Sequence, residues 1–209
     1  MLTHLASLRY ALSQLLVGSE GTLGVITAAA LHAPRAPAST VGALLCCAGF
    51  DDVLRVRDAA ERGLGETLAA LEVMDAAAYG AGLGGGASPV AEAPFYVLAE
   101  AAGANPRHDG EKMEAFAAAA LDSGAAADAA LALDGARLAR LWAIREACPV
   151  ALNAGADHYL YKYDLSLPAE SFYAVVDAAR DRLAPLGGVR VAAWGHLADG
   201  NVSLSAGCV

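Results

Sequence analysis

The chain has 209 residues, a formal net charge of −9 at pH 7 and an isoelectric point near 4.9. This acidic balance argues against nucleic acid or an anionic membrane surface as a partner, because both require clustered Lys and Arg. No apolar run approaches the roughly 18 residues that a membrane-spanning helix needs. Much of the hydrophobic content is alanine, so we expect a core of small aliphatic side chains with few aromatic anchors.

The N-terminal segment and the cysteines indicate a compartment. The first ten residues carry one arginine, no cationic block and no small-residue cleavage site after an apolar core, so no secretory signal is visible. Cys46 and Cys47 are adjacent, whereas Cys148 and Cys208 stand alone, and no pair has the C-x-x-C spacing of a zinc or redox site. The sequence therefore predicts buried thiols in a reducing compartment.

The first elements flank a glycine-rich segment, "GSEGTLG". Apolar runs at 12–17 and 23–26 predict a strand or helix, a turn and then a strand. The Pro- and Ala-rich connector at 33–39 predicts a domain boundary, since its prolines cannot donate to a strand ladder. After it, 40–50 predicts a buried strand and 51–64 a helix, with Asp51 or Asp52 as its N-cap.

The middle of the chain repeats this alternation. The glycine cluster at 79–88 predicts a mobile loop, because it has no apolar periodicity to bury. Residues 94–103 then predict a strand, and 111–124 predict a helix that ends at Gly124. Strand and helix alternate once more.

A strong helix is predicted to begin at Ala136, and its apolar stripe ends in a cation. The stripe contains Leu138, Leu141 and Trp142, and Arg145 is its next position. Arg145 either extends its charged end to solvent or binds an anion in a cleft. Pro149 lacks the N–H that would bond to the carbonyl of Arg145, so we expect the helix to kink or end beside the arginine.

The last third predicts a strand, a helix and a hairpin. Tyrosine and leucine alternate with mostly polar residues at 158–167, so Lys162 lies on the face opposite the tyrosines. Residues 168–183 predict an amphipathic helix, and 188–205 predict two short strands around an Asp199–Gly200 turn. The elements together predict an α+β fold, an antiparallel sheet with helices packed on one side.

Five segments, in order, resemble one family: "QLLVGSEGTLGVIT", "SPVAEAPFYVLAE", "LWAIREA", "YLYKYDLSLP" and "GHLADGN". They resemble the C-terminal part of the FAD-dependent D-2-hydroxyglutarate dehydrogenases, which have a vanillyl-alcohol-oxidase-type FAD domain. The resemblance runs from about Leu12 to Leu204. It implies that residues 1–33 are the C-terminal remnant of an FAD-binding domain. Residues 34–209 would be the substrate-binding domain, a ferredoxin-like FAD-linked oxidase C-terminal domain truncated at its C-terminus.

The resemblance also implies a cofactor contact. In the family, the "GSEGTLG" segment closes the FAD domain and brings backbone amides close to the cofactor. Glycine suits such a segment because it has no Cβ and adopts positive φ easily. The residues that would lie near FAD are Gly18, Ser19, Gly21, Thr22 and Val25.

Substrate binding is implied for three residues. Arg145 and Lys162 match the substrate-binding arginine and lysine of the family, and Asn201 falls in the matching "GHLADGN" motif. A 2-hydroxy diacid carries two carboxylates. Arginine offers a planar pair of donors to one of them, and lysine offers a compact charge to the other.

The same motif implies a divalent metal, commonly zinc, which two histidines bind in the family. His196 matches the first histidine, but Ser203 stands at the second histidine position and Ser205 at a nearby asparagine position. Ala198 replaces a glycine of the motif. A neutral serine hydroxyl is a poor zinc ligand beside imidazole or carboxylate. We therefore expect that the retained ligand does not hold a metal.

The implied function is oxidation of D-2-hydroxyglutarate to 2-oxoglutarate, with hydride transfer to FAD and then electron transfer to an electron-transfer-flavoprotein-type acceptor. We expect a fragment or truncated paralogue that is inactive alone. Two alternatives stay open, a non-catalytic carboxylate-binding or interaction module and a D-lactate or glycolate dehydrogenase of the same family. The family implies a mitochondrial location in a eukaryote and otherwise a cytoplasmic one.

Overall fold

A computed structural model describes residues 12–154 and 159–208, and the chain divides between Ala36 and Pro37 into two units. In the described part of the first unit, helix α1 (Leu12–Leu16) is followed by a turn and an extended segment. The strand expected at 23–26 does not form. Leu23 and Val25 are 66% and 87% exposed, because no described strand pairs with this segment.

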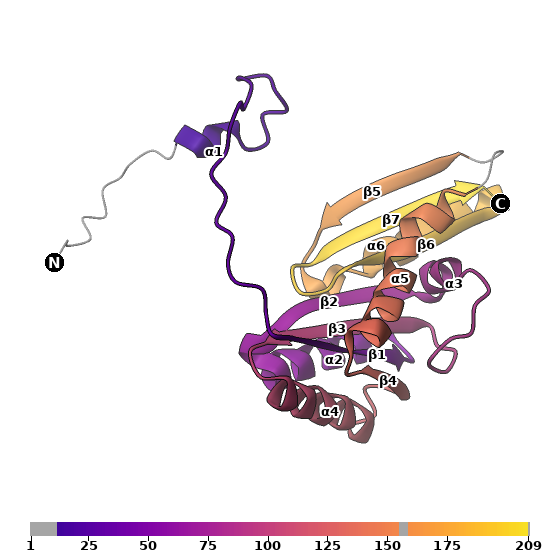
Figure 1. Ribbon diagram of the computed structural model, residues 1–209. Coiled ribbons are helices and arrows are strands. Elements are labelled where there is room, and N and C mark those ends of the chain that lie inside the picture. The colour runs from indigo at the N-terminus through magenta and orange to yellow at the C-terminus, as the bar shows by residue number, and fades with distance from the viewer. Residues whose placement is uncertain (1–11, 155–158, 209) are drawn as a thin grey trace. The chain divides into compact units, whose positions relative to one another are not determined.

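The second unit contains one seven-stranded sheet in the order β4-β1-β3-β2-β6-β7-β5, and all neighbouring strands are antiparallel (Figure 1). The strands are β1 (Ser39–Cys47), β2 (Leu68–Asp75), β3 (Phe95–Gly103), β4 (Asp128–Ala132), β5 (Leu160–Ser166), β6 (Val189–His196) and β7 (Asn201–Cys208). This arrangement confirms the predicted α+β class and antiparallel sheet. The start of the predicted strand at 158–167 lies outside the described residues.

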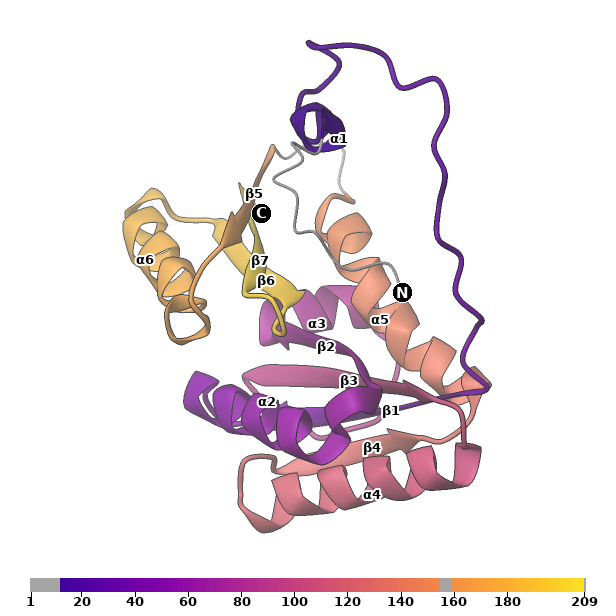
Figure 2. The ribbon, with the colours of Figure 1, turned by 90° about the vertical axis from the view of Figure 1, so that its left-hand side faces the viewer.

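The helices cover both faces of the sheet, whereas the sequence predicted helices on one side (Figure 2). Helices α2 (Phe50–Leu64), α4 (Pro106–Asp122) and α6 (Ala174–Leu183) pack on one face, and α3 (Ala76–Leu83) and α5 (Gly135–Leu152) on the other. Short 3-10 helices span Gly65–Thr67, Ala169–Ser171 and Ala184–Leu186. The physical reason lies in strands such as β1, whose side chains are buried on both faces and need cover on both.

Two strands were missed by the sequence patterns. Both β2 and β4 are rich in alanine, which has low strand propensity, and β2 carries two acidic residues. Part of the segment predicted as a mobile loop at 79–88 is also regular, because α3 continues to Leu83 before Gly84 adopts φ 58°. The loop prediction was therefore wrong for the first half of that segment.

Of the two outcomes predicted beside Arg145, a kink or an end of the helix, the end does not occur. Helix α5 continues through Pro149 to Leu152. Cys148 and Leu152 are buried in the core on that face, so tertiary packing holds the last turn in place despite the backbone hydrogen bond that proline removes.

Strands β2 and β6 join the two halves of the sheet through a short ladder. Its partner pairs are Glu72 with His196, Val73 with Gly195, and Met74 with Trp194. Because the ladder is short, the side chains beside it contribute strongly to holding the halves together.

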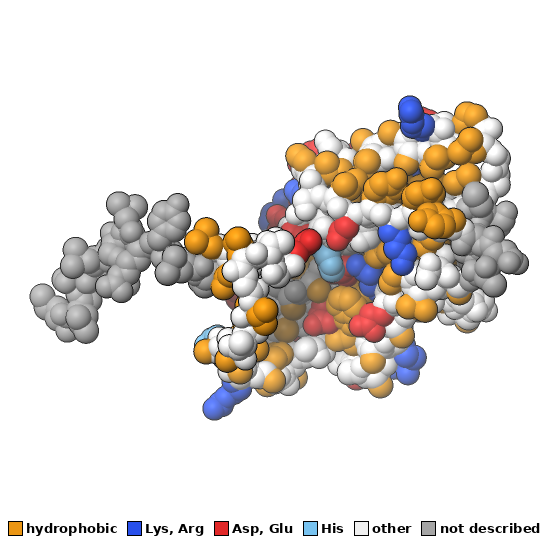
Figure 3. All heavy atoms as spheres, turned by 90° about the horizontal axis from the view of Figure 1, so that it is seen from above, with side chains coloured by type: hydrophobic (Ala, Val, Ile, Leu, Met, Phe, Trp, Pro, Cys, Tyr) orange, Lys and Arg blue, Asp and Glu red, His pale blue; other side chains and the backbone are white. Residues whose placement is uncertain are grey.

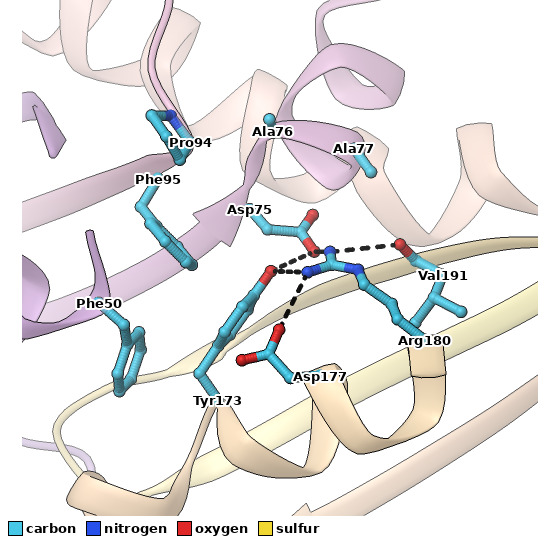
Figure 4. A pocket seen from close by; sticks show the side chains of 10 residues that line it. All are labelled: Phe50, Asp75, Ala76, Ala77, Pro94, Phe95, Tyr173, Asp177, Arg180 and Val191. Carbon is cyan, nitrogen blue, oxygen red and sulfur yellow. Dashed lines mark hydrogen bonds and ion pairs between the residues drawn. The ribbon is translucent and has the colours of Figure 1, made fainter. Parts of the chain in front are cut away.

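Asp75, at the end of β2, forms one such side-chain junction (Figure 4). Its carboxylate accepts hydrogen bonds from the backbone N–H groups of Ala78 at 2.8 Å and Ala193 at 2.9 Å. It also accepts from the Tyr173 hydroxyl at 3.1 Å and the Arg180 guanidinium at 2.7 Å. Burial raises the pKa of the Asp75 carboxyl, and the hydrogen bond from Ala78 and the charge of Arg180 act in the opposite direction. The network connects α3, α6 and β6.

Close packing of α3 on α5 generates a first prediction. A Cβ added at Gly82 would overlap the carbonyl oxygen of Ile144 in α5, whereas a Cβ at Gly80 in the same helix would meet nothing within 4 Å. We expect Gly82→Ala to lower the free energy of unfolding by about 1–3 kcal/mol through overpacking. Gly80→Ala is the matched control and should raise it by up to about 1 kcal/mol through helix propensity. Urea denaturation measures both, and equal effects would contradict the close approach.

The thiols generate a second prediction. Cys46, Cys47 and Cys148 are free and buried, as expected. Burial raises the pKa of all three, to about 12 for Cys47 and about 11 for Cys148. At pH 8 the thiolate of Cys148 is then roughly a thousandth of the total. We expect a disulfide reagent to leave these three unmodified in the native protein and to modify all three in denaturant. Peptide mass spectrometry locates the label, and native labelling of any of them would contradict the prediction.

Candidate functional site

A hollow of about 530 Å³ lies between α5 and the strands β5, β6 and β7. In Figure 3, acidic, basic and histidine side chains gather around a hollowed part of the surface. Helix α5 contributes Trp142, Arg145, Glu146 and Pro149, and the strands contribute Lys162, Tyr163, Asp164, Trp194, His196, Ser203, Leu204 and Ser205. The fold thus brings together residues that the sequence singled out from distant segments, namely Arg145, Pro149, Lys162, His196, Ser203 and Ser205.

Strand register explains why the polar residues face the same way. Lys162 pairs with Ser205 and Asp164 pairs with Ser203 across the β5–β7 ladder. Directly paired residues of an antiparallel ladder project to the same face. These four side chains therefore line the strand wall of the hollow, opposite α5.

A buried carboxylate lies between the arginine and the histidine. Glu72 on β2 is 3% exposed, and its Oε2 accepts from Arg145 Nε at 3.0 Å and pairs with Nη2 at 2.9 Å. The other oxygen, Oε1, lies 2.6 Å from His196 Nδ1. Arg145 is 9% exposed. Its charged end therefore does not extend into solvent. The anion that it binds is the carboxylate of Glu72, which belongs to the same chain.

Lys162 is less constrained than Arg145. Among the described residues, no hydrogen bond or ion pair engages its amine, and the residue is exposed. The carboxylates around it are Glu146 and Asp164, and Asp164 accepts a 2.8 Å hydrogen bond from Asn201 Nδ2. Asn201 projects from the same face of β7 as Ser203 and orients Asp164, but it is not among the residues that line the hollow.

Ser205 is the unusual hydroxyl of the site. Its residue is 1% exposed, and its Oγ is buried without a hydrogen-bond partner among the described residues. A buried hydroxyl usually has a partner, since an unmade hydrogen bond costs about 1–3 kcal/mol. The Ser205 hydroxyl, paired across the ladder with Lys162, therefore has unused hydrogen-bonding capacity at the wall of the hollow.

The donors around His196 do not fit a metal ion. In residues 12–154 and 159–208, no group of three His, Cys, Asp or Glu side chains converges as a metal site. Nδ1 of His196 faces Glu72, and the neighbouring positions hold the neutral hydroxyls of Ser203 and Ser205.

The predicted flavin contacts lie in the first unit. Gly18 and Gly21 adopt φ 78° and 81°, and Ser19 accepts hydrogen bonds from the backbone and hydroxyl of Thr22. A Cβ at either glycine would meet nothing within 4 Å, and Val25 is 87% exposed. The turn is well formed, but these residues alone build no flavin pocket.

Glu72 is the residue that the sequence patterns missed. It stands between apolar residues in "LAALEVMD", and a glutamate inside such a run is rarely buried without a partner. A glutamate within an apolar run was thus the signal that could have identified Glu72. Its partners could not be found in the same way, because they lie in distant segments of the sequence. Glu100, which accepts a 2.5 Å hydrogen bond from Trp142 Nε1, was missed for the same reason.

One further property of the described chain concerns membranes. None of the helices within the described ranges combines the length and apolar character needed to cross a bilayer.

Comparison with known proteins identifies the family and the fold of this chain. The family model "FAD linked oxidases, C-terminal domain" matches residues 36–208. The mitochondrial D-2-hydroxyglutarate dehydrogenase of Bos taurus is 46% identical over 98% of this chain, and a putative mitochondrial D-lactate dehydrogenase of Schizosaccharomyces pombe is 34% identical over 93%. The chain spans 38% and 39% of their lengths.

A solved structure supports the fold. Alkyldihydroxyacetonephosphate synthase superposes with a TM-score of 0.60 at 11% identity, over 93% of this chain and 41% of that one. The family match and the shared fold together show that this chain belongs to the FAD-linked oxidases, as a C-terminal domain of that family.

Proposed function

We propose that the chain is the substrate-binding portion of a flavin-dependent D-2-hydroxyglutarate dehydrogenase and that its hollow binds a small 2-hydroxy diacid. The observation that carries the proposal is the convergence of Arg145 and Lys162, from α5 and β5, on one hollow. Similarity to D-2-hydroxyglutarate dehydrogenases over nearly the whole chain supports the substrate. Residues 1–33 are proposed to be the end of an FAD-binding domain and 34–209 the substrate domain.

The two cations have different roles in this proposal. Glu72 already compensates the charge of Arg145, so Arg145 binds through its remaining N–H donors, in particular Nη1. Lys162, which has no ion-pair partner among the described residues, supplies the second charge, with the Ser205 hydroxyl beside it as a donor. A diacid can engage both regions with its two carboxylates.

Oxidation of the bound hydroxy acid to 2-oxoglutarate requires a hydride acceptor, which is FAD in this family. Gly18, Gly21 and their neighbours build no pocket for it by themselves, so we assign binding and orientation of the substrate to this chain. The electron-transfer-flavoprotein-type acceptor and the mitochondrial location are proposals from the family. Relatives named as mitochondrial support the location.

Two alternatives make different predictions. A non-catalytic carboxylate-binding module would bind the diacid, but no longer form of the protein would use the diacid to reduce a flavin. A D-lactate or glycolate dehydrogenase would bind a monoacid as tightly as the diacid, and the similarity to a putative D-lactate dehydrogenase supports this reading. Two cations in one hollow favour the diacid, because a monoacid carboxylate needs one.

Calorimetry of the 209-residue chain tests the binding proposal. We expect D-2-hydroxyglutarate to bind more tightly than D-lactate, and Lys162→Gln to weaken diacid binding roughly ten- to a hundredfold by removing a charge-assisted hydrogen bond. Arg137→Gln is the matched control, since it removes an exposed cation of α5 that does not line the hollow. Absence of diacid binding would end the proposal, and equal affinity for D-lactate would favour the monoacid alternative.

Arg145→Ala is expected to act differently from Lys162→Gln. It leaves the buried Glu72 carboxylate without its cation, and breaking a buried pair in this way costs about 3–5 kcal/mol of stability. Thermal denaturation should therefore show a large loss for Arg145→Ala and little change for Lys162→Gln. Similar stabilities of the two variants would contradict the assigned roles.

Catalysis by the isolated chain is a separate question. We expect no dye reduction when the 209-residue chain is mixed with FAD and D-2-hydroxyglutarate, because Gly18, Gly21 and their neighbours are exposed and hold no cofactor by themselves. Clear turnover above a protein-free control would refute this expectation.

A further inference from the structure

We propose that Glu72 is a positioning residue of the hollow, which holds Arg145 in place and sets the tautomer of His196. The proposal rests on the proposed function for its biological meaning, but its geometry stands without a ligand. Glu72 does not line the hollow. It lies behind it and acts through two residues that do.

The strand ladder places Glu72 for this role. Its backbone partner across β2 and β6 is His196, so the two side chains project to the same face, the one that α5 covers. Arg145 reaches the same point from α5. The carboxylate is 4% exposed as a side chain, and solvent therefore screens these contacts little.

Each carboxylate oxygen serves one partner. Oε2 receives both Nε and Nη2 of Arg145, and Oε1 faces Nδ1 of His196. Two contacts from one guanidinium to one oxygen restrict the orientation of the guanidinium plane. The edge of Arg145 that carries Nη1 is thereby held in a defined direction for a ligand.

The effect on His196 follows from the chemistry of an ionised carboxylate. Such a group only accepts hydrogen bonds, so the ring nitrogen facing Glu72 must donate. A neutral imidazole that carries its proton on Nδ1 has a lone pair on Nε2. Among the described residues, no hydrogen bond to Nε2 competes for that lone pair. His196 therefore offers an acceptor to the hydroxyl of a ligand, next to the cations that attract its carboxylates.

Glu72→Gln gives a distinctive expected result. Arg145 carries donors alone, so the amide oxygen of glutamine must turn toward it, and the amide NH₂ then faces His196. The histidine nitrogen at that contact has to accept, and its proton moves to Nε2. The variant is nearly isosteric, yet it is expected to reverse the tautomer.

Nitrogen-15 NMR of the histidine rings measures this without ligand, metal or flavin. In the wild-type chain with a neutral His196 ring, we expect the protonated-nitrogen signal of His196 on Nδ1. In Glu72→Gln we expect it on Nε2. His196→Asn assigns the resonance, because it removes that ring from the spectrum.

Asp75→Asn is the matched control. It removes a second buried carboxylate from the same strand, one paired with Arg180 on the other face of the sheet. It should destabilise the protein but leave the His196 tautomer unchanged.

A wild-type ring protonated on Nε2, an unchanged tautomer in Glu72→Gln, or the same reversal in Asp75→Asn would overturn the proposal. If a variant folds poorly, the wild-type spectrum still tests the proposal. Failure of diacid binding would contradict the proposed function but not this role of Glu72.

Discussion

Two buried carboxylates on one strand hold the halves of the sheet together. Glu72 and Asp75 lie near the end of β2, where the ladder to β6 consists of three partner pairs. A buried carboxylate costs several kcal/mol unless a cation and hydrogen bonds compensate it. Arg145 from α5 compensates Glu72 on one face, and Arg180 from α6 compensates Asp75 on the other. The placement of both helices against the sheet therefore depends on β2.

The hollow is a consequence of this junction. Glu72 draws α5 toward β6, and the strands beyond, β7 and β5, form the opposite wall (Figure 2). The interaction that creates the hollow also compensates one of its cations. The charges of the site are thus uneven. Glu72 compensates Arg145, whereas no described residue pairs with Lys162, which lines the hollow with Glu146 and Asp164.

The serines of β7 determine what chemistry the described residues support. Ser203 and Ser205 stand where the resemblance implies a histidine and an asparagine, and no described cluster of ligands surrounds His196. A hydroxyl can donate to a carboxylate but is a weak ligand for a divalent metal. The described site is consequently proposed to recognise an anion, with His196 as a hydrogen-bonding group.

The sequence by itself determined the long periodic elements, the terminal hairpin around Asp199–Gly200 and the family, because each depends on patterns or motifs within one segment. It also singled out Arg145, as a cation on an apolar stripe. It could not show that the nearest anion is Glu72, which is 73 residues away. The alanine-rich strands β2 and β4, the helices on both faces and the Glu72 contacts were decided by tertiary structure, since pairing and burial between distant segments override local propensity.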